Sequence, residues 1–360
     1  MKKIIIYSVI IFNLLFSQGF WGTEWPSPKI EYAPKTYVCY RVPSPIIMDG
    51  KLDEDAWQSA NWTDLFVDIE GRLKPKPFYN TRLKMLWDDE YFYFAVDMEE
   101  PHVWAKLKQR DTVIFKDNDF EIFLDPDGDT HNYYELEVNA LETEWDLMLL
   151  KPYHNQDKVA VDSWDIPGLI TKVYVDGTIN NPTDRDKGWS VEIAIPWKAL
   201  VNNFRSNTPP QEGEQWKVNF SRVQWDVDII DNKYVKTDSP EYNWVWSPQG
   251  IIYMHTPETW GLVQFTNENS INKNVRFKKN QLDQTKWALR NLWYRQSNYY
   301  FNHNRYTASI KKLGLNTKPV SGVKWPPLIS VTPSGWEAYI EEKDQKVFIR
   351  KDGKTWAEKI

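Results

Sequence analysis

The sequence predicts an all-β fold, an antiparallel β-sandwich followed by a C-terminal extension of one helix and a β-hairpin. Residues 36–267 contain many short segments in which apolar and polar side chains alternate, which is the period of a half-buried strand. Clusters of Asp, Gly, Asn and Pro separate these segments, as turns between strands require. Sustained helical spacing of apolar residues occurs only in residues 268–360. Short, regular strands with few helices are typical of a β-sandwich, including the immunoglobulin-like kind.

The first 19 residues have the layout of a secretory signal peptide. Two lysines follow Met1, residues 4–16 form an apolar run, and Ser17-Gln18-Gly19 offers a cleavage site. The run is shorter than the roughly 20 residues that a membrane span needs, and an N-terminal anchor helix is the alternative. We therefore expect a secreted, periplasmic or cell-surface protein with no membrane span after signal cleavage. Its one cysteine, Cys39, can form no intramolecular disulfide, so the core must hold the fold.

The strands of the predicted sandwich follow in order. Residues 81–87 and 91–97 alternate apolar and polar side chains around an acidic turn, which predicts a hairpin. Residues 53–59 and 198–201 are predicted to be single helical turns. Further strands are predicted at residues 119–125, 133–139, 144–150, 171–175, 189–196, 217–225 and 260–265.

The C-terminal extension, residues 268–360, changes character. Apolar residues at helical spacing predict a helix with Asp283 as its N-cap and Gly314 as its end. Alternation at Trp336–Ile340 and Val347–Ile349 predicts a hairpin. We expect this extension to pack on the sandwich, because so small a unit has little core of its own.

Composition excludes several functions. The chain has 44 Lys+Arg and 50 Asp+Glu, and 44 − 50 gives a net charge of −6, which argues against a nucleic-acid groove. One cysteine and five histidines do not predict a zinc site of the usual Cys/His kind. No motif of a known catalytic type is present, so we expect a binding protein and not an enzyme.

An acidic turn is the candidate metal site. Asp125, Asp127 and Asp129 offer oxygen ligands at alternate positions, which suits a structural calcium ion on a loop. The alternative is a polar hairpin turn without an ion, since Pro126 and Gly128 are turn formers.

Tryptophan is the most unusual feature of the composition, with 20 Trp against 15 Gly. An exposed indole ring can stack on the apolar face of a sugar while polar neighbours bind its hydroxyl groups. Most of the tryptophans are expected in the core, including Trp57, Trp87 and Trp260. Those in polar or turn contexts are candidates for exposure: Trp104, Trp145, Trp164, Trp225, Trp244 and Trp246.

Five ordered motifs in residues 45–261 resemble family 9 carbohydrate-binding modules. Together they are specific to that family, although each is short. They are Pro45–Trp57 (PIIMDGKLDEDAW), Leu83–Tyr93 (LKMLWDDEYFY), Asn118–Asp125 (NDFEIFLD), Gly188–Trp197 (GWSVEIAIPW) and the closing pair Trp246–Pro248 and Pro257–Gly261.

The resemblance implies a secreted, DOMON-like β-sandwich that clamps a sugar between two tryptophans and carries structural calcium. Glu121 matches the family's strand glutamate, and Phe115 stands where one clamp ring is expected. Glu137 replaces an arginine beside a matching Asn139. The second clamp position holds Met254 next to His255, so the missing ring would come from Trp225, Trp244 or Trp246.

The implied ligand is a plant-type polysaccharide or oligosaccharide of the xylan or cellulose class, bound in support of carbohydrate catabolism by glycoside hydrolases. The extension is then a docking element for such hydrolases or for cell-surface components. Two alternatives remain open. One is a haem-binding DOMON-like electron-transfer domain using Met148, Met254 or His255 as ligands. The other is a glycoside hydrolase acting through a carboxylate such as Glu121 or Asp119.

Overall fold

The computed structural model describes residues 26–155, 158–200, 209–269 and 273–360. Residues 29–279 form one compact unit and residues 280–360 form another, and each is described by itself. The predicted signal peptide lies outside the described residues. None of the helices in the described ranges is long and apolar enough to cross a membrane.

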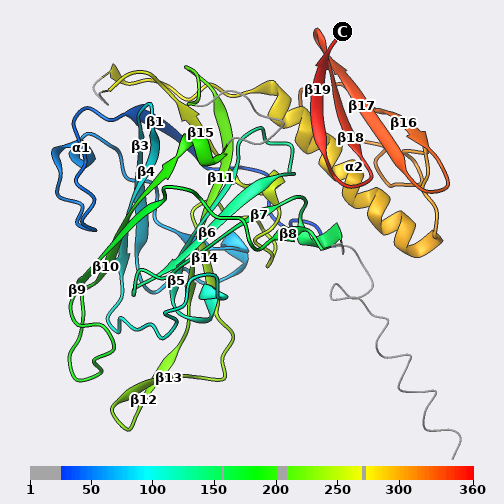
Figure 1. Cartoon of the computed structure of the whole chain (residues 1–360). Coiled ribbons are helices and arrows are strands. Elements are labelled where there is room, and N and C mark those ends of the chain that lie inside the picture. The colour runs from blue at the N-terminus through cyan, green and yellow to red at the C-terminus, as the bar shows by residue number, and fades with distance from the viewer. Residues whose placement is uncertain (1–25, 156–157, 201–208, 270–272) are drawn as a thin grey trace, which may run out of the picture. The chain divides into compact units, whose positions relative to one another are not determined.

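Residues 29–279 form two curled sheets that share the strand β1 (Thr36–Arg41), as Figure 1 shows. The first part of β1 pairs in parallel with β15 (Gly261–Phe265), and its end pairs in parallel with β3 (Thr81–Trp87). From β15 the first sheet continues through β11 (Gln215–Gln224), β5 (Asp119–Asp125), β6 (Tyr133–Asn139), β7 (Glu144–Leu149) and β8 (Ala160–Val161). From β3 the second sheet continues through β4 (Tyr91–Glu99), β10 (Gly188–Pro196) and β9 (Ile170–Asp176).

Shorter elements complete this unit. The helical elements are α1 (Asp55–Gln58), η1 (Gly71–Leu73), η2 (Ile114–Lys116), η3 (Tyr153–Asn155), η4 (Trp197–Leu200) and η5 (Pro257–Thr259). The short strands are β2 (Val67–Asp68), β14 (Tyr242–Val245) and the hairpin β12 (Val227–Ile230) and β13 (Lys233–Lys236). The predicted all-β sandwich is confirmed, because alternate residues of the strands contribute to one hydrophobic core between the two sheets.

The core is rich in aromatic side chains. Trp57, Trp87 and Trp260 are almost fully buried, as predicted for residues inside strand motifs. Trp104 is also buried, with 2% of its surface exposed, so the expectation that it is exposed is wrong. A polar sequence context does not prevent burial of a tryptophan, because its large ring removes much apolar area from water.

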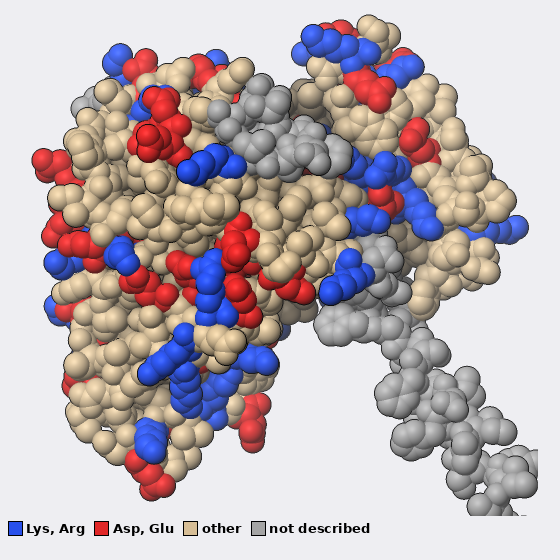
Figure 2. All heavy atoms as spheres, in the orientation of Figure 1, with Lys and Arg blue, Asp and Glu red and all other residues tan. Residues whose placement is uncertain are grey.

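Charge of both signs covers the visible face of the sandwich. Figure 2 shows Lys and Arg side chains gathered in its lower part, between β5 and the β12–β13 hairpin, with Asp and Glu side chains around them. The ends of η2 and β13 meet, because the Lys236 ammonium donates to the Lys116 carbonyl oxygen at 2.7 Å. Across this face the charges are mixed and do not form one extended patch.

Residues 280–360 contain α2 (Gln281–His303) and a four-stranded sheet in the order β16 (Leu328–Val331), β17 (Trp336–Glu342), β18 (Gln345–Arg350) and β19 (Thr355–Lys359). The predicted helix and hairpin are present, and β16 and β19 flank the hairpin. The N-cap is Asn280, whose side chain accepts the Leu282 N–H at 3.0 Å, and Asp283 lies in the first turn. The helix ends at Asn304, in a left-handed conformation, and not at Gly314.

This smaller unit has its own hydrophobic core. Leu289, Leu292 and Trp293 of α2 pack with Ala338 and Ile349 of the sheet. The expectation that the extension has little core of its own is therefore wrong. This core comes from α2, from β17 and β18 of the hairpin, and from Leu313, Leu315 and Val323 in the segment between the helix and the sheet.

Candidate functional site

The outer face of the first sheet carries carboxylates at its centre. Successive side chains of a strand point to opposite faces, so the core-facing residues of β5 and β6 alternate with outward-facing ones. The outward positions hold Asp119 and Glu121 on β5, and Glu135 and Glu137 on β6. Glu121 and Glu137 lie directly opposite each other in the antiparallel register. We call these four side chains the acidic sheet face.

All four carboxylates of the acidic sheet face are buried, with 5% or less of each residue exposed. Burial raises the pKa of Glu121 to about 7, while the nearby Ser221 hydroxyl opposes the shift. Burial raises the pKa values of Asp119, Glu135 and Glu137 well above their ordinary range, and neighbouring carboxylates add to these shifts. The face therefore binds protons near neutral pH, which is common at functional sites.

Two aromatic rings lie at one end of the acidic sheet face. The Phe115 N–H donates to Glu137 Oε2 at 2.9 Å, and the Trp225 indole N–H donates to the Phe115 carbonyl oxygen at 2.8 Å. Both rings are half-buried, and the Lys236 ammonium lies 3.6 Å from the centre of the Trp225 ring. The structure therefore brings Phe115, Trp225, Glu121 and Glu137 together, as a ligand site would require.

Met254 and His255 lie further along the same face. The His255 Nδ1 is 2.9 Å from the Tyr133 hydroxyl, and the Tyr153 ring meets the His255 ring edge-on at 4.5 Å. Burial lowers the pKa of His255 to about 3, so its imidazole is neutral. Between Tyr133 and Glu137 the strand advances four residues, about 14 Å. The predicted clamp residues thus contact β6 at positions four residues apart, Phe115 at Glu137 and His255 at Tyr133.

Three predicted site residues serve the fold instead. The amide group of Asn139 donates two hydrogen bonds and accepts two, all within 3.1 Å, so it has no capacity left for a ligand. Trp244 and Trp246 are only 1% exposed, so the expectation that either presents a ring to solvent is wrong. The Phe78 ring covers Trp244 at 4.8 Å, and Trp246 lies so close to Gly261 that a Cβ there would come within 2.4 Å of the indole.

The predicted calcium ligands are Asp125, at the end of β5, and Asp127 and Asp129, in the turn that leads to β6. One carboxylate oxygen of each lies within 4.8 Å of the others. Carboxylate oxygens on a loop are the donors that calcium prefers, so this set fits the ion. The same turn also holds itself together, because Asp125 accepts the N–H groups of Gly128 and Thr130 at 3.0 and 2.9 Å. The calcium site stays a prediction.

A family model matches most of the unit that carries this site. Residues 47–268 match the family described as carbohydrate family 9 binding domain-like. The chain belongs to this family. The resemblance argued from the five sequence motifs is therefore confirmed, and carbohydrate binding is the activity that the family description prints.

Solved structures similar to this family 9 chain include a family 9 module from Caldicellulosiruptor kristjanssonii with cellotriose. It has 17% identity and a TM-score of 0.41, and the match covers 68% of this chain and 100% of the other. A structure of a family 9 module from the same organism with glucose has 16% identity and a TM-score of 0.40, and the match covers 64% of this chain and 96% of the other. A candidate carbohydrate-binding protein from Bacteroides uniformis has 17% identity, a TM-score of 0.48 and coverage of 65% and 100%. No curated protein matches the sequence.

The residues suggested as haem ligands do not meet in this family 9 sandwich. Met148 packs against the core between the sheets, next to Tyr134 in the β6–β7 register. Met254 packs in a separate cluster that includes Tyr133, which points to the opposite face of β6. Met148 therefore cannot bind the same iron as Met254 or His255.

Other residues on the outer face of the first sheet are absent from the predicted site. Glu135 lies two residues before Glu137 on β6 and points to the same face, so the alternation in residues 133–139 could have placed Glu135 in the site. Tyr153 lies in η3 and Tyr253 in a loop, with its ring 5.7 Å from that of His255. Neither belongs to a periodic pattern, so the sequence offers no signal that places them here.

Proposed function

We propose that this protein is a secreted carbohydrate-binding protein that recognises a plant-type polysaccharide or oligosaccharide of the xylan or cellulose class. The observation that carries the proposal is the contact chain from Trp225 through Phe115 to Glu137, opposite Glu121. It places half-buried rings beside polar groups on one face of the sandwich. Family membership supports the ligand class, and the apolar run at residues 4–16 supports secretion.

The site suits a neutral sugar for two chemical reasons. An aromatic ring binds the C–H face of a pyranose through apolar contact, and a carboxyl group binds its hydroxyls through hydrogen bonds. With a pKa of about 7, Glu121 can donate or accept such a hydrogen bond near neutral pH. We propose that binding of this kind supports the breakdown of the polysaccharide by separate glycoside hydrolases.

The proposal is tested by screening the mature protein, from Phe20 onward, against a glycan array and then titrating the retained glycans by calorimetry. We expect binding to xylan- or cellulose-type oligosaccharides. Trp225→Ala should weaken it about tenfold, which corresponds to about 1.4 kcal/mol, because the ring supplies the apolar contact. Glu121→Gln should weaken it less, because an amide still makes hydrogen bonds.

The matched control is Trp356→Ala, which removes another half-buried tryptophan from the smaller unit. That variant should bind like the wild type. The proposal fails if no glycan is retained, or if Trp225→Ala and Trp356→Ala bind equally well.

A further inference from the structure

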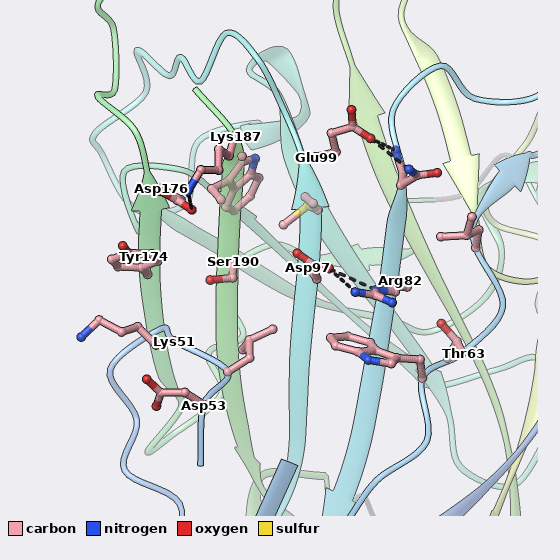
Figure 3. A pocket seen from close by; sticks show the side chains of 17 residues that line it. Lys51, Asp53, Thr63, Arg82, Asp97, Glu99, Tyr174, Asp176, Lys187 and Ser190 are labelled. Carbon is pink, nitrogen blue, oxygen red and sulfur yellow. Dashed lines mark hydrogen bonds and ion pairs between the residues drawn. The ribbon is translucent and has the colours of Figure 1, made fainter. Parts of the chain in front are cut away.

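The second sheet has a groove of about 850 Å³ on its outer face. Its floor is a row of four side chains in direct register across β9, β10, β4 and β3: Tyr174, Ser190, Asp97 and Arg82. Figure 3 shows this row crossing the four strands. Three intervals between adjacent strands span about 14 Å. The groove is therefore wide enough for several linked sugar rings and lies in the usual size range of ligand sites.

Gly188 lies in the next row of the floor. This row contains Asp176, Gly188 and Glu99, followed by Asn80 just before β3. A Cβ at Gly188 would lie 2.0 Å from the Met98 carbonyl oxygen, so the close approach of the strands requires glycine there.

The wall beside α1 is held in place before any ligand arrives. Glu192 accepts the N–H groups of Asp49 and Gly50 at 2.8 and 2.9 Å and the Trp57 indole N–H at 2.7 Å. The loop carrying Lys51 is thereby tied to β10. A wall ordered in advance lowers the entropy that binding must overcome.

Two aromatic rings line opposite sides of the groove. Trp62 lies over β3, with the Arg82 guanidinium 4.1 Å and the Lys84 ammonium 4.5 Å from its ring centre, and its side chain is half-buried. Tyr174 on β9 is 39% exposed. Cation–π contacts fix the Trp62 ring on the sheet. The groove thus combines rings for apolar contact with a floor of hydrogen-bonding groups.

The charges of the lining largely cancel. Arg82 pairs with Asp97 at 3.0 Å, and Lys187 pairs with Asp176 at 2.9 Å, as the dashed lines in Figure 3 show. Asn80 donates to Glu99 at 3.0 Å. Paired charges do not attract a strongly charged ligand, but their remaining donors and acceptors can bind hydroxyl groups. This chemistry favours a neutral, polyhydroxylated ligand.

We infer that this groove is a second glycan-binding site, on the opposite sheet from the acidic sheet face, and that it takes a neutral oligosaccharide of several sugars. The inference takes its class of ligand from the proposed function. The site itself is argued from the groove alone. Trp62 and Tyr174 provide the stacking surfaces, and the floor row from Ser190 to Arg82 binds hydroxyl groups.

The test uses the full mature chain with cellohexaose and xylohexaose as neutral probes and hexagalacturonate as a charged one. Calorimetry measures affinity, and hydroxyl-radical footprinting by mass spectrometry locates the ligand. We expect a neutral probe to protect residues 51–65 and 172–190, and Trp62→Ala to weaken that binding about tenfold. Trp62→Phe should recover part of the affinity, because it keeps a ring. Trp356→Ala is the matched control, and the thermal midpoint of each variant reports its folding.

The outcomes separate the two sites. Protection in the groove that survives Trp225→Ala supports the inference, even if the acidic sheet face proves inactive. The inference is overturned if neither neutral probe protects the groove at saturation, if hexagalacturonate binds there as well as the neutral probes, or if folded Trp62→Ala binds like Trp356→Ala. Loss of all protection in Trp225→Ala would also overturn it, because the groove would then not be an independent site.

Discussion

Glu121 shows how the surrounding fold sets the chemistry of a single side chain. It occupies an outward position of β5, yet it is only 5% exposed. Removal from water disfavours its charged form, and three more carboxylates lie on the same face. A buried carboxyl group of this kind costs stability, and such groups are common at functional sites.

Stability should therefore fall as the pH rises through the range set by Glu121. Its pKa is raised from 4.5 to about 7 in the folded protein, so between these values the folded state keeps a proton that the unfolded state has lost. The free energy of unfolding decreases by up to ~3 kcal/mol over this range, and no such penalty exists below pH 4.5. Glu121→Gln should flatten the decrease, as measured by denaturant unfolding from pH 4.5 to 8. Glu337→Gln, at an exposed residue of β17, should not. An unchanged slope in Glu121→Gln would contradict this assignment.

Single residues differ in how well the sequence predicts them. Strand alternation puts Glu121 and Glu137 at outward-facing positions of their strands, so their shared face could be predicted. Trp62 and Trp225 could not be told from buried tryptophans, because exposure depends on which loop covers the ring. Trp244 illustrates this, since Phe78, more than 160 positions away in the chain, covers it.

At the scale of elements, alternation predicts strands well when one face meets the core. The bounds of β3, β5 and β6 agree with prediction residue for residue. β1 was not among the predicted strands. Its adjacent residues Cys39 and Tyr40 are both buried, so the strand lacks the alternation of apolar and polar side chains. The end of α2 at Asn304 depends on a left-handed turn that helical spacing alone does not reveal.

The β5–β6 turn is the element on which we propose that calcium acts. If Asp125, Asp127 and Asp129 bind the ion, calcium stabilises the folded state by about 2.7 kcal/mol at a concentration 100 times the dissociation constant. The thermal midpoint should then be higher in calcium than in EDTA. Asp127→Asn should reduce that difference, because it removes a charge while its side-chain oxygen can still accept the Asp129 N–H.

Glu137→Gln is the control for this calcium experiment. Asp119, Glu121 and Glu137 also bring oxygens within 4.8 Å of one another, so an ion bound there would respond to that variant. Equal thermal midpoints in calcium and EDTA would argue against any stabilising ion. If Glu137→Gln reduces the difference in thermal midpoint and Asp127→Asn does not, the ion is bound at the acidic sheet face.

At the scale of the whole molecule, each of the two compact units has its own core. Residues up to Lys278 still bond to the sandwich, since the Val275 N–H donates to the Tyr40 hydroxyl at 3.0 Å and the Lys278 N–H donates to Gln264 at 2.8 Å. A deletion that preserves these bonds begins at Asn280. Separate cores allow the roles of the two units to be tested separately.

Deletion of residues 280–360 should leave glycan binding within about twofold of the full chain, because both proposed sites lie in residues 29–279. If the smaller unit docks to glycoside hydrolases or to cell-surface components, the same deletion should abolish that association. Calorimetry with xylohexaose measures the first effect, and cell fractionation with co-purification of glycoside hydrolases measures the second. Deletion that weakens glycan binding tenfold or more, in a protein that keeps the thermal midpoint of the sandwich, would show that the smaller unit contributes to the ligand site. If the association with hydrolases and with the cell surface is unchanged after the deletion, the smaller unit is not the docking element.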